Sequence, residues 1–430
     1  MKQKVDANKL RKGMFVCDLD RPWLESPFLF QGFLLRSHEE IEEIKKLCEY
    51  VYIDCERGAD KDGNVLKIVY DKNKHGEKEK KSAKIRKPQI RKEEKKAKPV
   101  AQRKYTTSFE DEISPARKLR DIAHTYVEKI YNDIRAGKSI QAKTARTIVN
   151  GMVDSILRNP DALVLLNNLR DRDDYAVAHS LNVCTLTLSF ARYLGFSHRE
   201  MIELGIGALL HDVGELRVPT EIMRKPGFLS KDENELMQSH TLHGADILST
   251  SKDIPATAIE IARSHHERSK GQGYPAGLRE AEITHYARIV GIVDVYDSVT
   301  HNQIDTNSIS STEALKNMYN WRNEMFDSHL VEQFIQCLGI YPIGSIVELD
   351  SGEVGIVISI ALDRRLQPKL MLVRDEKKQP YMPPLIINLA HYTEGDDASR
   401  YEINRVLEPG DYGIDLKSYL LRDISLEVSH

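Results

Sequence analysis

Leu209-Leu210-His211-Asp212-Val213-Gly214 decides how this chain can be interpreted, because its central pair places an imidazole beside a carboxylate. A His-Asp dipeptide alone occurs by chance and is only a weak sign of a metal site. Further nitrogen and carboxylate groups lie on both sides of it, in the order His179, His240, His265, His266 and Asp294. Seven such groups are too many for one zinc ion and suit two metal ions that share a carboxylate. They predict a two-metal site suited to phosphoester hydrolysis.

Helical patterns surround these side chains. Apolar residues recur every three to four positions around His179, and the run Met201–Leu210 shows the same spacing and ends at His211. Rigid helices that project ligands into one interior are how helical bundles build two-metal sites. We therefore predict a mainly α fold with a helical domain at residues 115–340. Its first helix is expected to bury a stripe formed by Leu119, Ile122, Ala123, Tyr126, Ile130 and Ile134.

The composition is typical of a soluble globular protein. Of the 430 residues, 41% are hydrophobic and 30% are charged, and the formal net charge is -3. The cysteines show no CxxC spacing, which predicts free thiols in a reducing compartment: Cys17, Cys48, Cys55, Cys184 and Cys337. No apolar run approaches the roughly 20 residues of a membrane helix, and the first residues lack an apolar signal core. We expect a cytoplasmic protein.

Two different segments precede the helical domain. Residues 1–57 alternate short apolar pieces with turns and predict a small α+β module. Residues 58–114 are polar, and positions 71–104 hold 15 Lys or Arg against 5 Asp or Glu, so we interpret this segment as a disordered linker. A basic run could also bind nucleic acid or an anionic membrane surface. It lacks interleaved aromatic residues for stacking on bases, so the solvated linker is preferred.

The last region, residues 341–430, has the pattern of a β-rich appendage. Two apolar runs, Ser345–Leu349 and Val354–Ile358, flank Asp350-Ser351-Gly352 and indicate a hairpin. Residues 369–373 offer a third strand. The pattern assigns this region no function.

Taken together, these motifs resemble the HD-GYP family, a branch of the HD metal-dependent phosphohydrolases. The matching stretches are His179-Ser180-Leu181-Asn182-Val183, His211-Asp212-Val213-Gly214, Lys225-Pro226-Gly227, His240, His265-His266-Glu267-Arg268, Gly273-Tyr274-Pro275 and Asp294-Val295-Tyr296-Asp297. The region around Leu10–Val16 also resembles a domain of unknown function that often precedes HD-GYP domains. The resemblance implies an all-helical catalytic domain with an iron or manganese pair, and the imidazole-rich ligand set also suits zinc. It also implies hydrolysis of cyclic dinucleotides, chiefly cyclic di-GMP.

The resemblance also implies roles for individual residues. Asp212 would bridge the metals, with His179, His211 and Asp294 around one ion and His240, His265 and His266 around the other. The catalytic set would be His211, Asp212 and Glu215. Substrate contacts would come from Arg268, Lys270, Gly273, Tyr274, Pro275 and Gln303. The Gly-Tyr-Pro loop and the flanking domains could also bind signalling proteins.

Three positions depart from the family pattern. Glu215 stands where the family usually has a lysine, and Lys270 replaces an aspartate. Gln303 stands where an arginine commonly contacts substrate phosphate. The first and third changes remove positive charge from the place where phosphates would bind.

The matches and the departures leave three hypotheses. The first is an active phosphodiesterase whose substrate is cyclic di-GMP or 3'3'-cyclic GMP-AMP. The second is a catalytically impaired HD-GYP protein that acts as a binding or scaffold module in second-messenger signalling. The third is a hydrolase of another phosphoester. The complete ligand set favours the enzyme, whereas Glu215 and Gln303 favour the other two.

Overall fold

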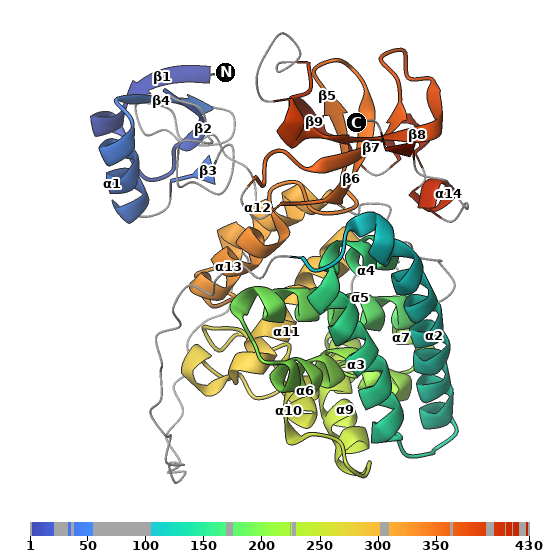
Figure 1. The fold of residues 1–430 in the computed structure, drawn as a ribbon. Helices are drawn as coiled ribbons and strands as arrows, with labels where there is room; N and C mark the ends of the chain where they lie inside the picture. Colours follow the sequence, from blue (N-terminus) through green and yellow to red (C-terminus); the bar gives the residue numbers. More distant parts are fainter. Residues whose placement is uncertain are drawn as a thin grey trace. The chain divides into compact units, whose positions relative to one another are not determined.

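In the computed structural model, the chain divides into two units, Met1–Ala101 and Gln102–His430. The residues that the structure describes are 2–20, 33–35, 38–54, 105–168, 175–223, 225, 229–301, 309–361, 364–392, 400–408, 410–414, 416–420 and 427–428. The basic segment at 71–104 lies outside them. Figure 1 shows the elements of each unit in sequence colours.

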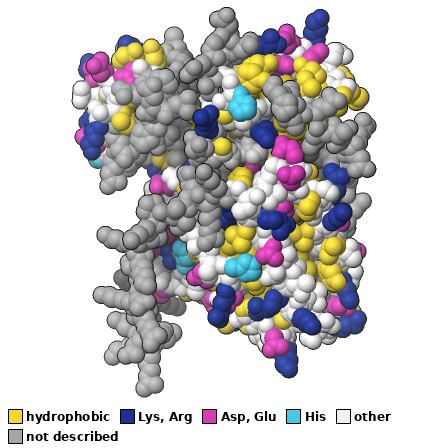
Figure 2. Space-filling view, viewed as in Figure 1, with side chains coloured by type: hydrophobic (Ala, Val, Ile, Leu, Met, Phe, Trp, Pro, Cys, Tyr) yellow, Lys and Arg dark blue, Asp and Glu magenta, His cyan; other side chains and the backbone are white. Residues whose placement is uncertain are grey.

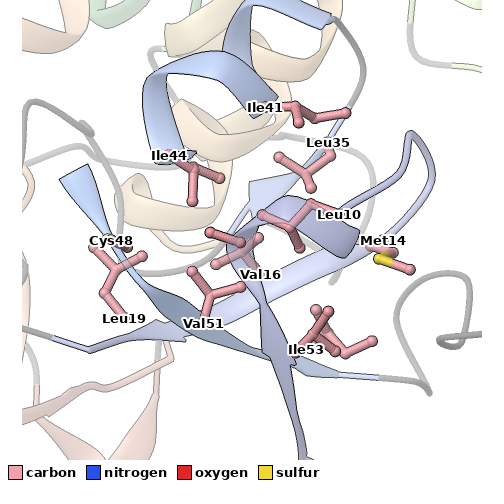
Figure 3. Packing of buried hydrophobic residues seen from close by; sticks show 12 residues of the cluster. Leu10, Met14, Val16, Leu19, Leu35, Ile41, Ile44, Cys48, Val51 and Ile53 are labelled. Atoms are coloured by element: carbon pink, nitrogen blue, oxygen red, sulfur yellow. The ribbon is translucent and has the colours of Figure 1, made fainter. Parts of the chain in front are cut away.

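The first unit confirms the predicted small α+β fold. Its antiparallel strands follow the order β1-β4-β2-β3, and helix α1 supplies apolar side chains to the same core. Alternation along β4 buries Val51 and Ile53, and helical spacing buries Ile41 and Ile44 of α1 (Figure 3). The elements are β1 (Lys2–Asp6), η1 (Ala7–Lys9), β2 (Phe15–Leu19), β3 (Phe33–Leu34), α1 (His38–Leu47) and β4 (Tyr50–Asp54).

The second unit begins as the predicted helical domain. Helix α5 lies at its centre, in contact with α2, α3, α4, α6, α11 and α13, so His179 is carried on a buried scaffold. The helices are α2 (Phe109–Arg135), α3 (Ala142–Arg158), α4 (Pro160–Asn167), α5 (Tyr175–Leu194), α6 (His198–Leu209), η4 (Val213–Arg217), α7 (Thr220–Met223), α8 (Lys231–Gln238), α9 (His240–Ser249), α10 (Ala256–Ser264), η5 (Glu280–Glu282), α11 (His285–Thr300), α12 (Ser311–Trp321) and α13 (Ser328–Leu338).

Helix α2 begins before residue 115, the predicted start of the helical domain. Its first turns are formed by residues 109–114, which belong to the predicted linker. Ser108 caps the helix by accepting a hydrogen bond from the Asp111 amide. The buried Glu112 carboxylate accepts hydrogen bonds of 2.7 and 2.8 Å from the Arg158 guanidinium on α3. The helix continues through Pro115, although proline lacks the backbone donor.

The predicted buried stripe of α2 was also partly wrong. Ala123 and Ile130 are buried as expected, but Ile122 is 54% exposed and Tyr126 is 42% exposed. Figure 2 shows hydrophobic side chains among charged ones on the outward surface over α2. The face that packs instead carries Ala116, Ala123, Val127, Ile130 and Tyr131.

A β-sheet follows the helices. Its strand order is β10-β8-β7-β6-β5-β9, and β5 and β6 pair as the predicted hairpin, with Gly352 at φ 87° in the turn. Pairing is antiparallel except between β10 and β8. The elements are β5 (Ile346–Leu349), β6 (Val354–Ser359), β7 (Lys369–Arg374), β8 (Pro380–Asn388), η6 (Leu389–His391), β9 (Ile403–Val406), η7 (Asp411–Gly413), α14 (Leu416–Leu420) and β10 (Glu427–Val428).

Polar contacts attach this sheet to the helices. The buried Asp161 carboxylate of α4 accepts hydrogen bonds from the Ser359 hydroxyl at 2.6 Å, the Ile360 amide at 3.3 Å and the Tyr105 hydroxyl at 3.1 Å. Asn168 donates to the carbonyl of Ile343. Because α4 also packs on α5, the sheet is joined to the helix that carries His179. Within the described part of the chain, no helix combines the length and apolar character that a bilayer crossing requires.

We expect Gly214→Ala to destabilise the fold, because a Cβ there would overlap the carbonyl oxygen of His240 and the backbone nitrogen of Gly244. Overpacking of this kind lowers the free energy of unfolding by about 3 kcal/mol. Denaturant unfolding of the variant and the unsubstituted protein measures this difference. Gly244→Ala is the matched control across the same contact, since its Cβ would meet its nearest neighbour at 3.4 Å. Equal stability of Gly214→Ala and the unsubstituted protein would contradict this packing.

Candidate metal centre

Seven side chains meet in one buried cluster inside the second unit. His179 comes from α5, His211 and Asp212 from the turn between α6 and η4, and Asp294 from α11. The remaining three are His240, which begins α9, and His265 and His266, which follow the last residue of α10. Six of the seven are at most 8% exposed, and the His266 side chain is 19% exposed. The structure thus brings together all seven residues that were predicted from the sequence to be metal ligands.

Asp212 lies between two groups of histidines. Its Oδ2 is 3.1 Å from His211 Nε2 and 3.5 Å from His179 Nε2. Its Oδ1 is 3.2 Å from His265 Nε2 and 3.5 Å from His240 Nε2. One carboxylate therefore presents a different oxygen to each group.

Two sets of side chains could each hold a metal ion. The ligand atoms of each set lie within 4.8 Å of one another. We call them the His179 group and the His240 group; both include Asp212. The His179 group is His179, His211, Asp212 and Asp294, and the His240 group is Asp212, His240, His265 and His266.

Hydrogen bonds at Nδ1 fix how four of the rings present Nε2. The Nδ1 atoms of His211, His240 and His265 lie 2.8, 2.7 and 3.0 Å from the backbone carbonyl oxygens of the residues Ala208, Met237 and Ile261. A carbonyl only accepts, so each Nδ1 donates and, in the neutral ring, Nε2 keeps its lone pair. His179 Nδ1 lies 2.7 Å from a carboxylate oxygen of Asp297. This is the arrangement of metal-binding histidines, whose second nitrogen is held by an acceptor.

The donor set fits divalent metal ions. His240 Nε2 and His265 Nε2 lie 3.5 Å apart, and both face Asp212 Oδ1. In the neutral rings, all three atoms are hydrogen-bond acceptors, so none of them can donate to another. Among the residues that the structure describes, buried His211 Nε2 and Asp212 Oδ1 find no hydrogen-bond partner. Acceptors buried in this way are costly unless a cation or protons lie between them. A divalent metal ion at each group would satisfy them.

The two groups differ in charge. Burial disfavours the charged form of His211, but the adjacent Asp212 carboxylate outweighs it and raises the pKa of His211 to about 10. The pKa of His179 also lies well above its ordinary value, because hydrogen bonds to carboxylates outweigh its burial. Burial, reinforced by the charge of His265, instead lowers the pKa of His266 well below its usual range. Carboxylate charge is therefore concentrated on the His179 side.

The Gly-Tyr-Pro loop packs against the His240 group. The Tyr274 ring stacks on His266 with centroids 4.7 Å apart. Glu267 holds the loop from inside, its carboxylate accepting from the Ala276 amide at 2.7 Å and the Leu278 amide at 2.8 Å. A Cβ at Gly273 would overlap the carbonyl oxygen of His266, so a side chain cannot be accommodated there without a shift of the backbone. Glu267 belongs to the motif His265-His266-Glu267-Arg268, but no local pattern predicts this structural role.

The other predicted site residues have different surroundings. Glu215 lies on η4, half-buried and outside both groups, and burial together with Asp212 raises its pKa to about 8. Arg268 donates through Nη1 to the carbonyls of His265 and Glu267 and lies over the Phe326 ring. Lys270 is exposed and pairs through its backbone with Arg279. Pro275 is part of the Gly-Tyr-Pro loop, and Gln303 lies outside the described residues.

Two residues behind His179, Asn182 and Asp297, belong to the matching motifs, but no role was predicted for them from the sequence. Asp297 is fully buried and accepts from His179 Nδ1 and from the Asn182 side-chain amide. Each follows a predicted ligand by three positions on its helix: Asn182 follows His179, and Asp297 follows Asp294. That i, i+3 spacing places each residue on the same helix face as the ligand that precedes it, and it is the feature of the sequence that could have predicted their roles.

Comparison with known proteins places this centre in a family. Residues 163–330 match a family described as "HD domain", and residues 2–145 match "Domain of unknown function (DUF3391)". The chain is 30% identical over 411 residues to "Cyclic di-GMP phosphodiesterase PA4108" of Pseudomonas aeruginosa, covering 94% of this chain and 92% of that protein. It is 32% identical over 159 residues to "3'3'-cGAMP-specific phosphodiesterase 1" of Vibrio cholerae, covering 36% of each.

A solved structure is also similar. Bd1817, an HDG"Y"P protein from Bdellovibrio bacteriovorus, matches with a TM-score of 0.45 and 17% identity over 79% of this chain and 99% of its own. The relative that spans nearly the whole chain agrees with the two domain matches and the Gly-Tyr-Pro motif. The chain belongs to the HD-GYP family of HD-domain proteins, with a DUF3391 domain at its N-terminus.

Proposed function

We propose that this chain is a metal-dependent phosphodiesterase that opens a cyclic dinucleotide to its linear form. The observation that carries this proposal is Asp212, whose two oxygens face two separate groups of histidines. Cyclic di-GMP is the first substrate to test, because the relative that matches over 92% of its length is named for it. 3'3'-Cyclic GMP-AMP is the second, on the match to the Vibrio cholerae enzyme.

Each of the two groups would bind one metal ion. Asp212 would bind both ions, His179, His211 and Asp294 would complete one shell, and His240, His265 and His266 the other. Two ions so placed would neutralise phosphoryl charge and lower the pKa of a water that attacks phosphorus. Both groups contain imidazole and carboxylate but no thiol, which favours iron or manganese, with zinc as the third option.

The surroundings of the cluster would position the substrate. Tyr274, stacked on His266, would form one wall of the substrate site, and Glu267 would keep that wall in place. The exposed Lys270 would offer a positive charge to a phosphate. Arg268 is engaged by two backbone carbonyls, so we assign it to holding the loop rather than to the phosphate.

We expect the double substitution His211→Ala/Asp212→Ala to abolish bound metal and turnover together, because it removes the shared carboxylate. The measurement is metal content of anaerobically purified protein, followed by chromatography of cyclic di-GMP and 3'3'-cyclic GMP-AMP reactions. His198→Ala is the matched control, since His198 begins the same helix α6 but is 46% exposed and pairs with Asp154. Retained turnover in the double variant would refute the site, and bound metal without product in the unsubstituted protein would favour the binding module.

We expect Glu215→Lys to increase cyclic di-GMP hydrolysis at saturating metal, because a cation there would attract the phosphate, whereas Glu215 offers no positive charge in either protonation state. Glu215→Gln should lie between the two above pH 8, where Glu215 is ionised, since it removes the negative charge without adding a positive one. The checks are kcat and KM for all three proteins. Lower kcat in both variants would show that the Glu215 carboxylate itself contributes to the site.

A further inference from the structure

The two metal positions do not have equivalent surroundings. In the His179 group, Asp294 Oδ1 lies 3.3 Å from His179 Nε2, so this group has a carboxylate of its own beside the shared Asp212. In the His240 group, the carboxylate among the grouped ligands is the shared Asp212, and the other three members are histidines. A divalent ion would therefore meet more negative charge in the His179 group.

Asp297 adds to this difference from behind the ligands. Its Oδ2 is 2.7 Å from His179 Nδ1, whereas the Nδ1 partners of His211, His240 and His265 are neutral backbone carbonyls. The carboxylate is fully buried, so water screens its charge little. The Asn182 side-chain amide donates to its other oxygen and holds it in this orientation.

The carboxylates of Asp294 and Asp297, both on α11, thus lie on the His179 side of Asp212. On the other side, stacking with Tyr274 positions His266 without adding charge.

We propose that the His179 group is the tighter of the two metal positions and that Asp297 is the positioning residue that makes it so. A carboxylate that accepts the second nitrogen of a ligating histidine fixes its tautomer and raises its basicity, and losing such a partner typically weakens metal affinity roughly 10- to 100-fold. Asp297 acts in this way on His179 alone among the ligands. This inference rests on the metal pair of the proposed function but not on its substrate.

The test separates the two positions by substitution and titrates each with Mn²⁺ alone. His240→Ala/His265→Ala leaves the His179 group, and His179→Ala/His211→Ala leaves the His240 group. Free Mn²⁺ is followed by electron paramagnetic resonance in the full chain, after removal of metal with a chelator. We expect the protein that keeps the His179 group to bind one Mn²⁺ at least about 10-fold more tightly than the other.

Asp297→Asn is then added to each protein, which completes a double-mutant cycle. It should weaken Mn²⁺ binding roughly 10- to 100-fold where His179 is present and change it less than about threefold where His179 is absent. Asp246→Asn is the control for loss of a carboxylate at a distance, because Asp246 lies exposed on α9 and pairs with Arg217. It should change neither affinity.

Equal affinities of the two groups, or tighter binding by the His240 group, would overturn the proposal, and this comparison does not depend on how well Asp297→Asn folds. An equal loss in both proteins on adding Asp297→Asn would also overturn it. Two unequal metal positions in a protein that cleaves neither cyclic dinucleotide would support this inference while refuting the proposed substrates.

Discussion

The Asp212 carboxylate is the constraint on which the rest of the centre depends. It is 8% exposed, and its two oxygens face Nε2 atoms of four histidines. Acceptor atoms crowded in a buried space are unfavourable unless cations join them. The fold keeps them there because backbone carbonyls and Asp297 hold the outer nitrogens of those rings. The protein thus maintains an arrangement whose main benefit is metal binding.

The helical scaffold explains how this arrangement is built. Ligands arrive from α5, α9, α11 and the ends of α6 and α10, and α5 is enclosed by other helices on most of its surface. Gly214 lets η4 approach α9 closely enough for Asp212 to reach His240. The C-terminal sheet is attached to α4 through the buried Asp161, so it forms part of the body that supports α5.

Much of the fold class could be predicted because it depends on local patterns. Apolar spacing indicated the helices around His179 and His211, and the turn at Asp350–Gly352 indicated the β5–β6 hairpin. The buried face of α2 could not be predicted in full, since Ile122 and Tyr126 fit the helical period yet point outward. Which apolar side chains are buried depends on the neighbouring helices, and that information lies outside the local sequence.

The candidate site shows the same limit. The ligand types and their order were visible in the sequence, but the surroundings of Asp297 and Arg268 depend on how α5, α11 and the Gly-Tyr-Pro loop pack.

The most direct test of the two-metal centre is anomalous diffraction at the manganese edge from crystals grown with Mn²⁺. We expect two peaks on opposite sides of Asp212, one against His179 and one against His265. A single peak, or peaks away from Asp212, would contradict the two-metal centre.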